Sequence, residues 1–170
     1  MEKISSNYVA LSGEFAVLSK LAFHGFDANM TLGNTKNIDI LVSDPRTNLM
    51  YQLEVKTSLN TRIKESTKSE NFGTFAFSWI MGKKHEIISR KELWYCFVSI
   101  DLESGGQRFF IVPSNVVSKY VEMQHKYWLN KNKKHQDSDM RVFRLGFKGE
   151  KYNFETPIIE DYENNWNFKK

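Results

Sequence analysis

Apolar residues recur at steps of three and four between residues 7 and 24, and this spacing predicts a helix. The apolar stripe consists of Tyr8, Leu11, Phe15, Leu18 and Leu21–Ala22. Gly25 follows the last periodic residue, where a glycine commonly ends a helix. We therefore expect a helix followed by a sharp change of chain direction.

Three short strands separated by turns follow this helix in the pattern. The expected strands are 26–32, 38–42 and 49–55, and the expected turns, rich in Gly, Asn, Asp and Pro, are 33–37 and 44–48. The second strand is an apolar run interrupted by one acid, Asp39. If the second and third strands form a hairpin across the 44–48 turn, Asp39 lies beside Glu54.

The remaining pattern predicts further strands and a second helix. A polar loop is expected at 57–73, a strand or buried turn at 74–81, strands at 93–100 and 108–112, and a helix from 113 to about 130. Ser114 suits the N-cap of that helix. The run 93–100 is apolar almost throughout, which is typical of a strand inside a sheet. This order predicts an α/β (α+β layered) domain with a mixed central sheet flanked by helices.

Length and composition narrow the class of protein. A chain of 170 residues with 41% hydrophobic and 26% charged residues indicates one globular domain, 1–170, and excludes collagen-like and low-complexity chains. We expect a core at about 7–132, and we assign no role to the C-terminal extension, 133–170. The single cysteine, Cys96, excludes an internal disulfide and fits a reducing compartment. No stretch approaches the roughly 18 apolar residues of a membrane span, so we expect no membrane contact and a cytoplasmic location.

The charge pattern favours polyanionic partners. The net charge is +4 and the pI is about 9.0, with basic residues concentrated in the middle of the chain and acidic residues in its tail. Ordinary solvated faces explain the same pattern, and charge alone does not separate the two interpretations. The candidate phosphate contacts are Lys36, Arg62, Lys64, Lys83, Lys84, Lys131, Lys133 and Lys134.

Candidate chemistry is concentrated in the first third of the chain. A carboxylate such as Asp39 inside an apolar strand requires a partner or a metal ion. Glu54 and Lys56 are two residues apart on the next strand, so both side chains point to one face of the sheet. Two carboxylates suit Mg²⁺, and a nearby lysine can orient a water molecule or stabilise charge on a phosphate. A solvated Glu-x-Lys pair remains the alternative, as does a surface position for Glu14 on the first helix.

Other side chains carry less specific signals. The histidines, His24, His85, His125 and His135, have no zinc-binding spacing. Cys96 lies within a strand and is expected to be a buried small hydrophobe. Trp79 is expected in the core, because a role in stacking on a base would require it to be exposed.

The acidic pattern resembles the PD-(D/E)xK nuclease superfamily. The matching segments are Gly13-Glu14, residues 37–42 around Asp39, and residues 52–58 around Glu54 and Lys56. The layout is similar to archaeal Holliday-junction resolvases and small restriction-type nucleases, although Ile38 replaces the proline that names the motif. The resemblance implies a restriction-endonuclease-like core and a Mg²⁺-dependent endonuclease that acts on duplex or branched DNA, with Mn²⁺ as a substitute. It implies catalytic roles for Asp39, Glu54, Lys56 and Glu14, and metal binding by Asp39, Glu54, Glu14 and the carbonyl of Val55.

Two rival interpretations remain at this point. One is a fold-mate that binds nucleic acid without cutting it, and the other is a structural module in which the carboxylates and the lysine form a salt-bridge network. The resemblance also leads us to expect a homodimer, because cutting both strands of a duplex with one small site per chain usually requires two copies.

Overall fold

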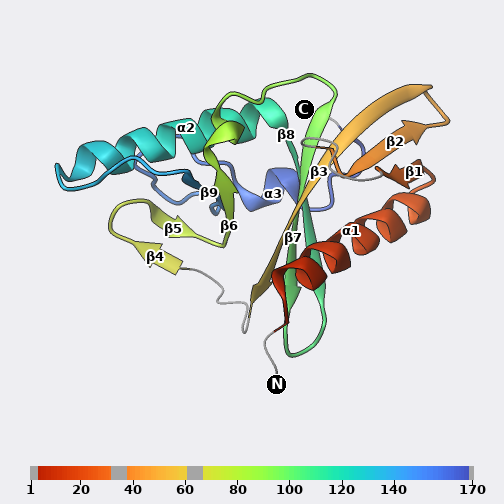
Figure 1. Cartoon of the computed structure of the whole chain (residues 1–170), viewed down its shortest axis with the longest axis horizontal. Coiled ribbons are helices and arrows are strands. Elements are labelled where there is room, and N and C mark those ends of the chain that lie inside the picture. Colours follow the sequence, from red (N-terminus) through yellow and green to blue (C-terminus); the bar gives the residue numbers. More distant parts are fainter. Residues whose placement is uncertain (1–3, 32–37, 61–66, 169–170) are drawn as a thin grey trace.

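A mixed five-stranded sheet forms the centre of the molecule (Figure 1). The computed structural model describes residues 4–31, 38–60 and 67–168. The helices are α1 (Ser6–Phe23), α2 (Ser114–Lys131) and α3 (Ile159–Tyr162), with a single 3₁₀ turn at Lys83–Glu86. The strands are β1 (Asp27–Met30), β2 (Ile40–Asp44), β3 (Leu49–Asn60), β4 (Thr67–Ser69), β5 (Gly73–Phe75), β6 (Phe77–Gly82), β7 (Leu93–Asp101), β8 (Gln107–Pro113) and β9 (Met140–Leu145).

The central sheet has the strand order β1-β2-β3-β7-β8. Strands β3 and β7 are parallel, whereas the other neighbouring pairs are antiparallel, so the sheet is mixed. Two smaller antiparallel sheets, β4–β5 and β6–β9, lie outside it. The expected layered architecture, a mixed central sheet flanked by helices, is confirmed.

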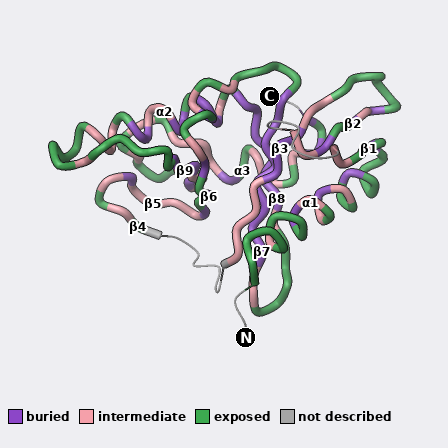
Figure 2. Tube along the Cα trace, in the orientation of Figure 1, coloured by how far each residue is buried: buried purple, intermediate pink, exposed green. Residues whose placement is uncertain are grey.

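Two hydrophobic cores lie on the two faces of this sheet. Helix α1 covers one core, which contains Val17, Leu53 and Val98, while α2, β6 and β9 cover the other, which contains Phe97 and Phe143. Figure 2 shows the continuous buried course of β7 between these layers. The apolar run at 93–100 is therefore an interior strand, as expected, because it has a core on each side.

The C-terminal part of the chain contributes to both cores. Phe143 on β9 and Ile159 on α3 pack into the second core. Trp166 and Phe168 pack into the first core. The segment 133–170, to which the sequence assigns no role, thus supplies apolar side chains to both faces of the sheet.

Two local expectations were wrong. The polar loop expected at 57–73 is partly strand, because β3 continues to Asn60 alongside β7 and because β4 forms a short hairpin with β5. Ser114 is not the N-cap of α2 but its first helical residue, after Pro113. The Ser114 hydroxyl instead donates to the Arg90 carbonyl and accepts from the Arg90 N–H, so it fixes the loop before β7 to the helix.

Helix α1 turns a different side toward the sheet from the apolar stripe that the sequence pattern picks out. Its core-facing residues are Gly13, Val17 and Leu21, whereas Tyr8 and Phe15, which belong to the apolar stripe, are exposed. The helix begins and ends almost where expected, with Ser5 as N-cap and a left-handed Gly25 after it. No helix among the described residues is long and apolar enough to cross a membrane.

Candidate active site

The site is built on the hairpin of β2 and β3. The Asp44 carboxylate accepts from the Arg46 N–H at 3.0 Å, and Asn48 adopts a left-handed conformation with φ 58°, so the turn reverses the chain tightly. The register pairs Ile40 with Leu53, and the Asp39 N–H donates to the Leu53 carbonyl at 2.7 Å. The hairpin therefore brings Asp39 opposite Glu54, as the sequence predicted.

Strand β3 is longer than its neighbour β2, so the later part of β3 has no β2 residues beside it. Asp39 lies at this uncovered edge of β3. The Val55 N–H donates to Asp39 Oδ2 at 2.6 Å, in place of the strand partner that β2 would provide. In a strand, the N–H and C=O of alternate residues face the same neighbour. Because the Leu53 carbonyl faces the β2 side, the Val55 carbonyl faces the edge that carries Asp39.

Glu54 is the buried carboxylate of the site. Its residue is only 3% exposed, and Oε1 accepts from Lys56 Nζ at 2.6 Å. The expectation that Glu54 and Lys56 share one face is confirmed by this contact. Among the described residues, Oε2 of Glu54 is buried and has no hydrogen-bond partner. A buried carboxylate oxygen without a donor is costly unless a cation or a water molecule satisfies it.

Helix α1 adds a third carboxylate. Gly13 allows α1 to approach β3 closely, because a Cβ at this position would stand 1.8 Å from Thr57 Oγ1. Glu14 is the next residue on the helix and is half-buried. Burial, followed by the charges of Asp39 and Glu54, raises the pKa of Glu14, while Lys56 acts in the opposite direction. Glu14 therefore belongs to the same electrostatic cluster as the two strand carboxylates.

Negative and positive neighbouring charges both affect the pKa of Asp39. Burial raises the pKa of Asp39 above its usual range, and the Glu54 charge adds to this effect. The Val55 N–H and the charges of Lys56 and Lys84 partly offset the rise in this pKa. The exposed Lys84 is thus a cation from outside the β2–β3 hairpin whose charge lowers the pKa of Asp39.

Two buried side chains below Glu54 were missed by sequence reasoning. Tyr95 pairs with Glu54 in the β3–β7 register, and its hydroxyl lies 2.7 Å from His85 Nδ1. Burial and the charges of Lys56 and Lys84 lower the pKa of His85 to about 3, so His85 is neutral at pH 7. Neither residue has a motif, because their proximity to the site arises from pairing between β3 and β7.

The oxygen donors fit a hard cation, although the carboxylates do not form a preassembled cage. Among the described residues, no group of three or more His, Cys, Asp and Glu side chains is arranged to hold a metal ion. The edge instead presents the Asp39 and Glu54 carboxylates together with the Val55 carbonyl. Mg²⁺ is typically held by one or two carboxylates and keeps several waters, so this donor set and the unpartnered Glu54 Oε2 are compatible with it.

The candidate DNA contacts do not all gather at this site. Lys36, Arg62 and Lys64 lie outside the described residues. Lys83 donates to the Asp137 carboxylate at 2.6 Å, whereas the charge of Lys84 lowers the pKa of Asp39. The exposed lysines Lys131, Lys133 and Lys134 lie at the C-terminal end of α2, which Figure 1 shows far from α1.

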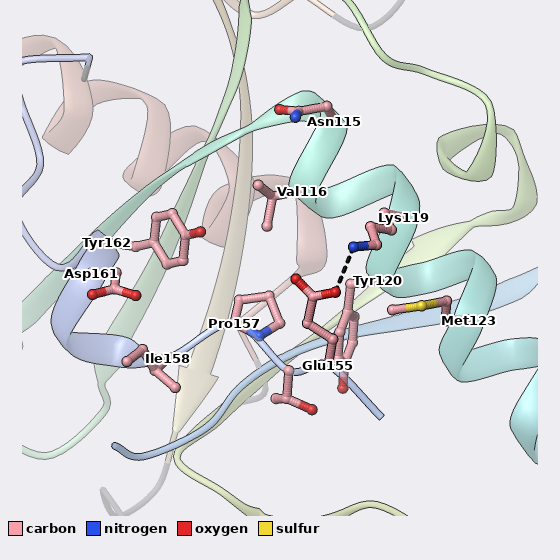
Figure 3. A pocket seen from close by; sticks show the side chains of 11 residues that line it. Asn115, Val116, Lys119, Tyr120, Met123, Glu155, Pro157, Ile158, Asp161 and Tyr162 are labelled. Carbon is pink, nitrogen blue, oxygen red and sulfur yellow. Dashed lines mark hydrogen bonds and ion pairs between the residues drawn. The ribbon is translucent and has the colours of Figure 1, made fainter. Parts of the chain in front are cut away.

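Three other features do not belong to the candidate site. Trp79 is buried and donates to the Val98 carbonyl at 3.0 Å, so it does not stack on a base. Cys96 is buried, and burial raises the pKa of its thiol, as expected for a small core residue. A pocket between α2 and the segment leading into α3 is lined partly by Lys119 and Glu155, which pair with each other (Figure 3).

Comparisons with known proteins provide little further information. No protein-family model matches the sequence, and no curated protein matches it either. The fold is similar to the solved structure of a bacterial homing endonuclease, with a TM-score of 0.49 and 13% sequence identity over 97% of this chain and 91% of the other. This likeness concerns the course of the backbone alone.

Proposed function

We propose that this chain is a metal-dependent endonuclease that hydrolyses DNA phosphodiester bonds. The observation that carries the proposal is the meeting of Asp39, Glu54 and Lys56 at the open edge of β3, where Asp39 is anchored to the Val55 N–H. This arrangement supports the resemblance to the PD-(D/E)xK superfamily, which rests on the same residues. Both restriction-type and junction-directed cleavage are compatible with it.

The residues have distinct roles in this proposal. Asp39, Glu54 and the Val55 carbonyl would hold Mg²⁺ or Mn²⁺, and Glu14 would be an auxiliary ligand on the α1 side. A bound divalent ion lowers the pKa of a coordinated water and polarises the scissile phosphate. Lys56 orients the attacking water or stabilises negative charge developing on the phosphate. The ion pair with Glu54 holds the Lys56 ammonium at the site.

The main competing explanation is a structural ion pair. In that case Glu54 and Lys56 contribute only stability, and removing one partner of a buried pair costs about 3–5 kcal/mol. The two explanations differ in their response to divalent cations. A ligand cluster is stabilised by Mg²⁺ or Mn²⁺ through mass action, whereas a salt-bridge network is not.

The test combines thermal unfolding with cleavage of supercoiled plasmid and four-way branched DNA in Mg²⁺, in Mn²⁺ and with a chelator. Asp39→Asn is the most informative variant, because asparagine can still accept from the Val55 N–H but carries no charge. Since burial and Glu54 already raise the pKa of Asp39, the metal-free variant should be at least as stable as the wild type. It should also be inactive and should lose the metal-dependent rise in melting temperature.

Two further variants separate metal binding from chemistry. Glu54→Gln should behave like Asp39→Asn toward the metal, whereas Lys56→Ala should retain the metal-dependent rise in melting temperature but lose cleavage. Glu122→Gln is the matched control, because Glu122 pairs with Lys126 on α2. A wild type that ignores both cations, together with strongly destabilised Asp39→Asn and Glu54→Gln proteins, would refute the nuclease and support the ion-pair network.

A further inference from the structure

Helix α1 has two apolar faces, and only one of them is covered. The core-facing side carries Gly13, Val17 and Leu21. The opposite side carries an exposed apolar stripe, which we call the outer stripe; its members are Tyr8 (68% exposed), Leu11 (40%) and Phe15 (56%). A contiguous exposed apolar patch, unlike a single exposed apolar residue, commonly marks an interaction surface. The outer stripe therefore indicates a surface that is covered in the functional assembly.

The spacing of the outer stripe is that of a helix–helix seam. Its members follow one another at steps of three and four residues, and Leu18, which is half-buried against the first core, continues the series at the edge of the stripe. Alternating steps of three and four keep side chains on one line of a helix and let them interlock with a second helix. The packing of α1 onto its own sheet does not require this second line, because Gly13, Val17 and Leu21 already make that contact.

The outer stripe carries no charge. The charged residues of α1 are Glu14 and Lys20, and neither lies on the stripe. Glu14 belongs to the carboxylate cluster, and Lys20 Nζ lies 5.7 Å from the centre of the Phe109 ring of its own chain. A DNA backbone would require cations on this face. A second copy of the same face meets no like charge and offers the same apolar side chains.

We propose that the outer stripe is the surface through which two copies of this chain pair, α1 against α1, about a two-fold axis. A two-fold interface uses the same patch on both subunits, so a self-complementary uncharged stripe suits it. The three side chains expose on the order of 300 Å² per protomer, given that a fully buried aromatic side chain contributes roughly 150–250 Å². With the residues between them, the pair buries on the order of 1,000 Å², which is the lower end for a specific interface.

This interface would connect the two candidate sites through one element. Glu14 lies on the same helix as the outer stripe, so pairing of the α1 helices sets the separation and orientation of the two carboxylate clusters. The pairing itself does not depend on the proposed nuclease activity. Sedimentation of a catalytically inactive variant such as Lys56→Ala would still report it, so the two proposals can fail separately.

The experiment is sedimentation equilibrium of the full chain, with two matched phenylalanine variants. Phe15→Glu places a charge on the outer stripe, whereas Phe23→Glu places the same charge on α1 away from the stripe, at a residue that is 83% exposed. We expect a wild-type dimer, an at least tenfold weaker dimer for Phe15→Glu, and wild-type behaviour for Phe23→Glu. Circular dichroism and melting temperature confirm that both variants are folded.

Two results would overturn the proposal. One is a wild-type protein that remains monomeric at concentrations of hundreds of micromolar. The other is a dimer that Phe15→Glu and Phe23→Glu weaken equally or not at all, since the interface would then lie elsewhere. Should Phe15→Glu fail to fold, Tyr8→Ser makes the same test, because Tyr8 is the most exposed member of the outer stripe.

Discussion

Gly13 on α1 and Thr57 on β3 lie in such close contact that no side chain fits between them. A Cβ at residue 13 would stand 1.8 Å from Thr57 Oγ1, 2.9 Å from its Cβ and 3.0 Å from its Cγ2. This contact sets the distance between the helix that carries Glu14 and the strand that carries Glu54 and Lys56.

Gly13→Ala should therefore force α1 away from β3. Overpacking of this kind costs about 1–3 kcal/mol, even though alanine favours a helix more than glycine does. Urea unfolding measures the loss, and Ser12→Ala, at an exposed position of the same helix, should stay within about 0.5 kcal/mol of the wild type. Adding Thr57→Ala should restore part of the stability, because it removes two of the three clashing atoms. A Gly13→Ala protein as stable as Ser12→Ala would contradict the contact.

His85 should make the protein sensitive to mild acid. Its pKa is about 3 in the folded protein, against 6.5 for the free side chain, because it is buried and lies near Lys56 and Lys84. Between these values the unfolded chain binds one more proton, so the free energy of unfolding falls as the pH falls below 6.5. The slope is at most about 1.4 kcal/mol per pH unit.

His85→Gln removes this titration and keeps a group that can hydrogen-bond to the Tyr95 hydroxyl. Urea unfolding from pH 7.5 to 4.5 should give a shallower pH dependence for His85→Gln than for the wild type. Parallel curves for the two proteins would show that His85 is not held neutral in the folded state.

Trp79 should be essential to the packing of β6 and β9 onto the central sheet. Its ring lies 4.9 Å from that of Phe97, and its indole N–H donates to the Val98 carbonyl. Trp79→Ala should cost about 3–5 kcal/mol of the free energy of unfolding. The next residue, Ile80, points to the other face of β6 and is 72% exposed, so Ile80→Ala should be nearly neutral. Similar losses for the two variants would place Trp79 outside the core.

Lys84 and Lys83 should differ in their effect on DNA binding. Each phosphate contact contributes about −0.9 to the slope of log affinity against log salt. Lys84→Ala should make the slope less steep by about one contact, because its charge acts at the carboxylate site. Lys83→Ala should change the slope less, since Lys83 is paired with Asp137. Equal slopes for the wild type and Lys84→Ala would leave Lys84 as ordinary surface.

Local pattern was sufficient to predict the central part of the candidate site. Asp39, Glu54 and Lys56 lie within two strands joined by a short turn, so a two-residue period and a tight turn place them together. The interior position of β7 was predictable for the same kind of reason, because a strand with a core on both faces is apolar along almost its whole length.

Contacts between distant segments were beyond the reach of such patterns. Periodicity places the apolar residues of α1 on lines but does not say which line meets the sheet, and Gly13 decides this through its contact with Thr57. The position of His85 and Tyr95 below Glu54 depends on the parallel pairing of β3 with β7, whose partners lie about 40 residues apart. Neighbours along the chain are constrained by backbone geometry alone, whereas these contacts exist only after the sheet and its two cores have assembled.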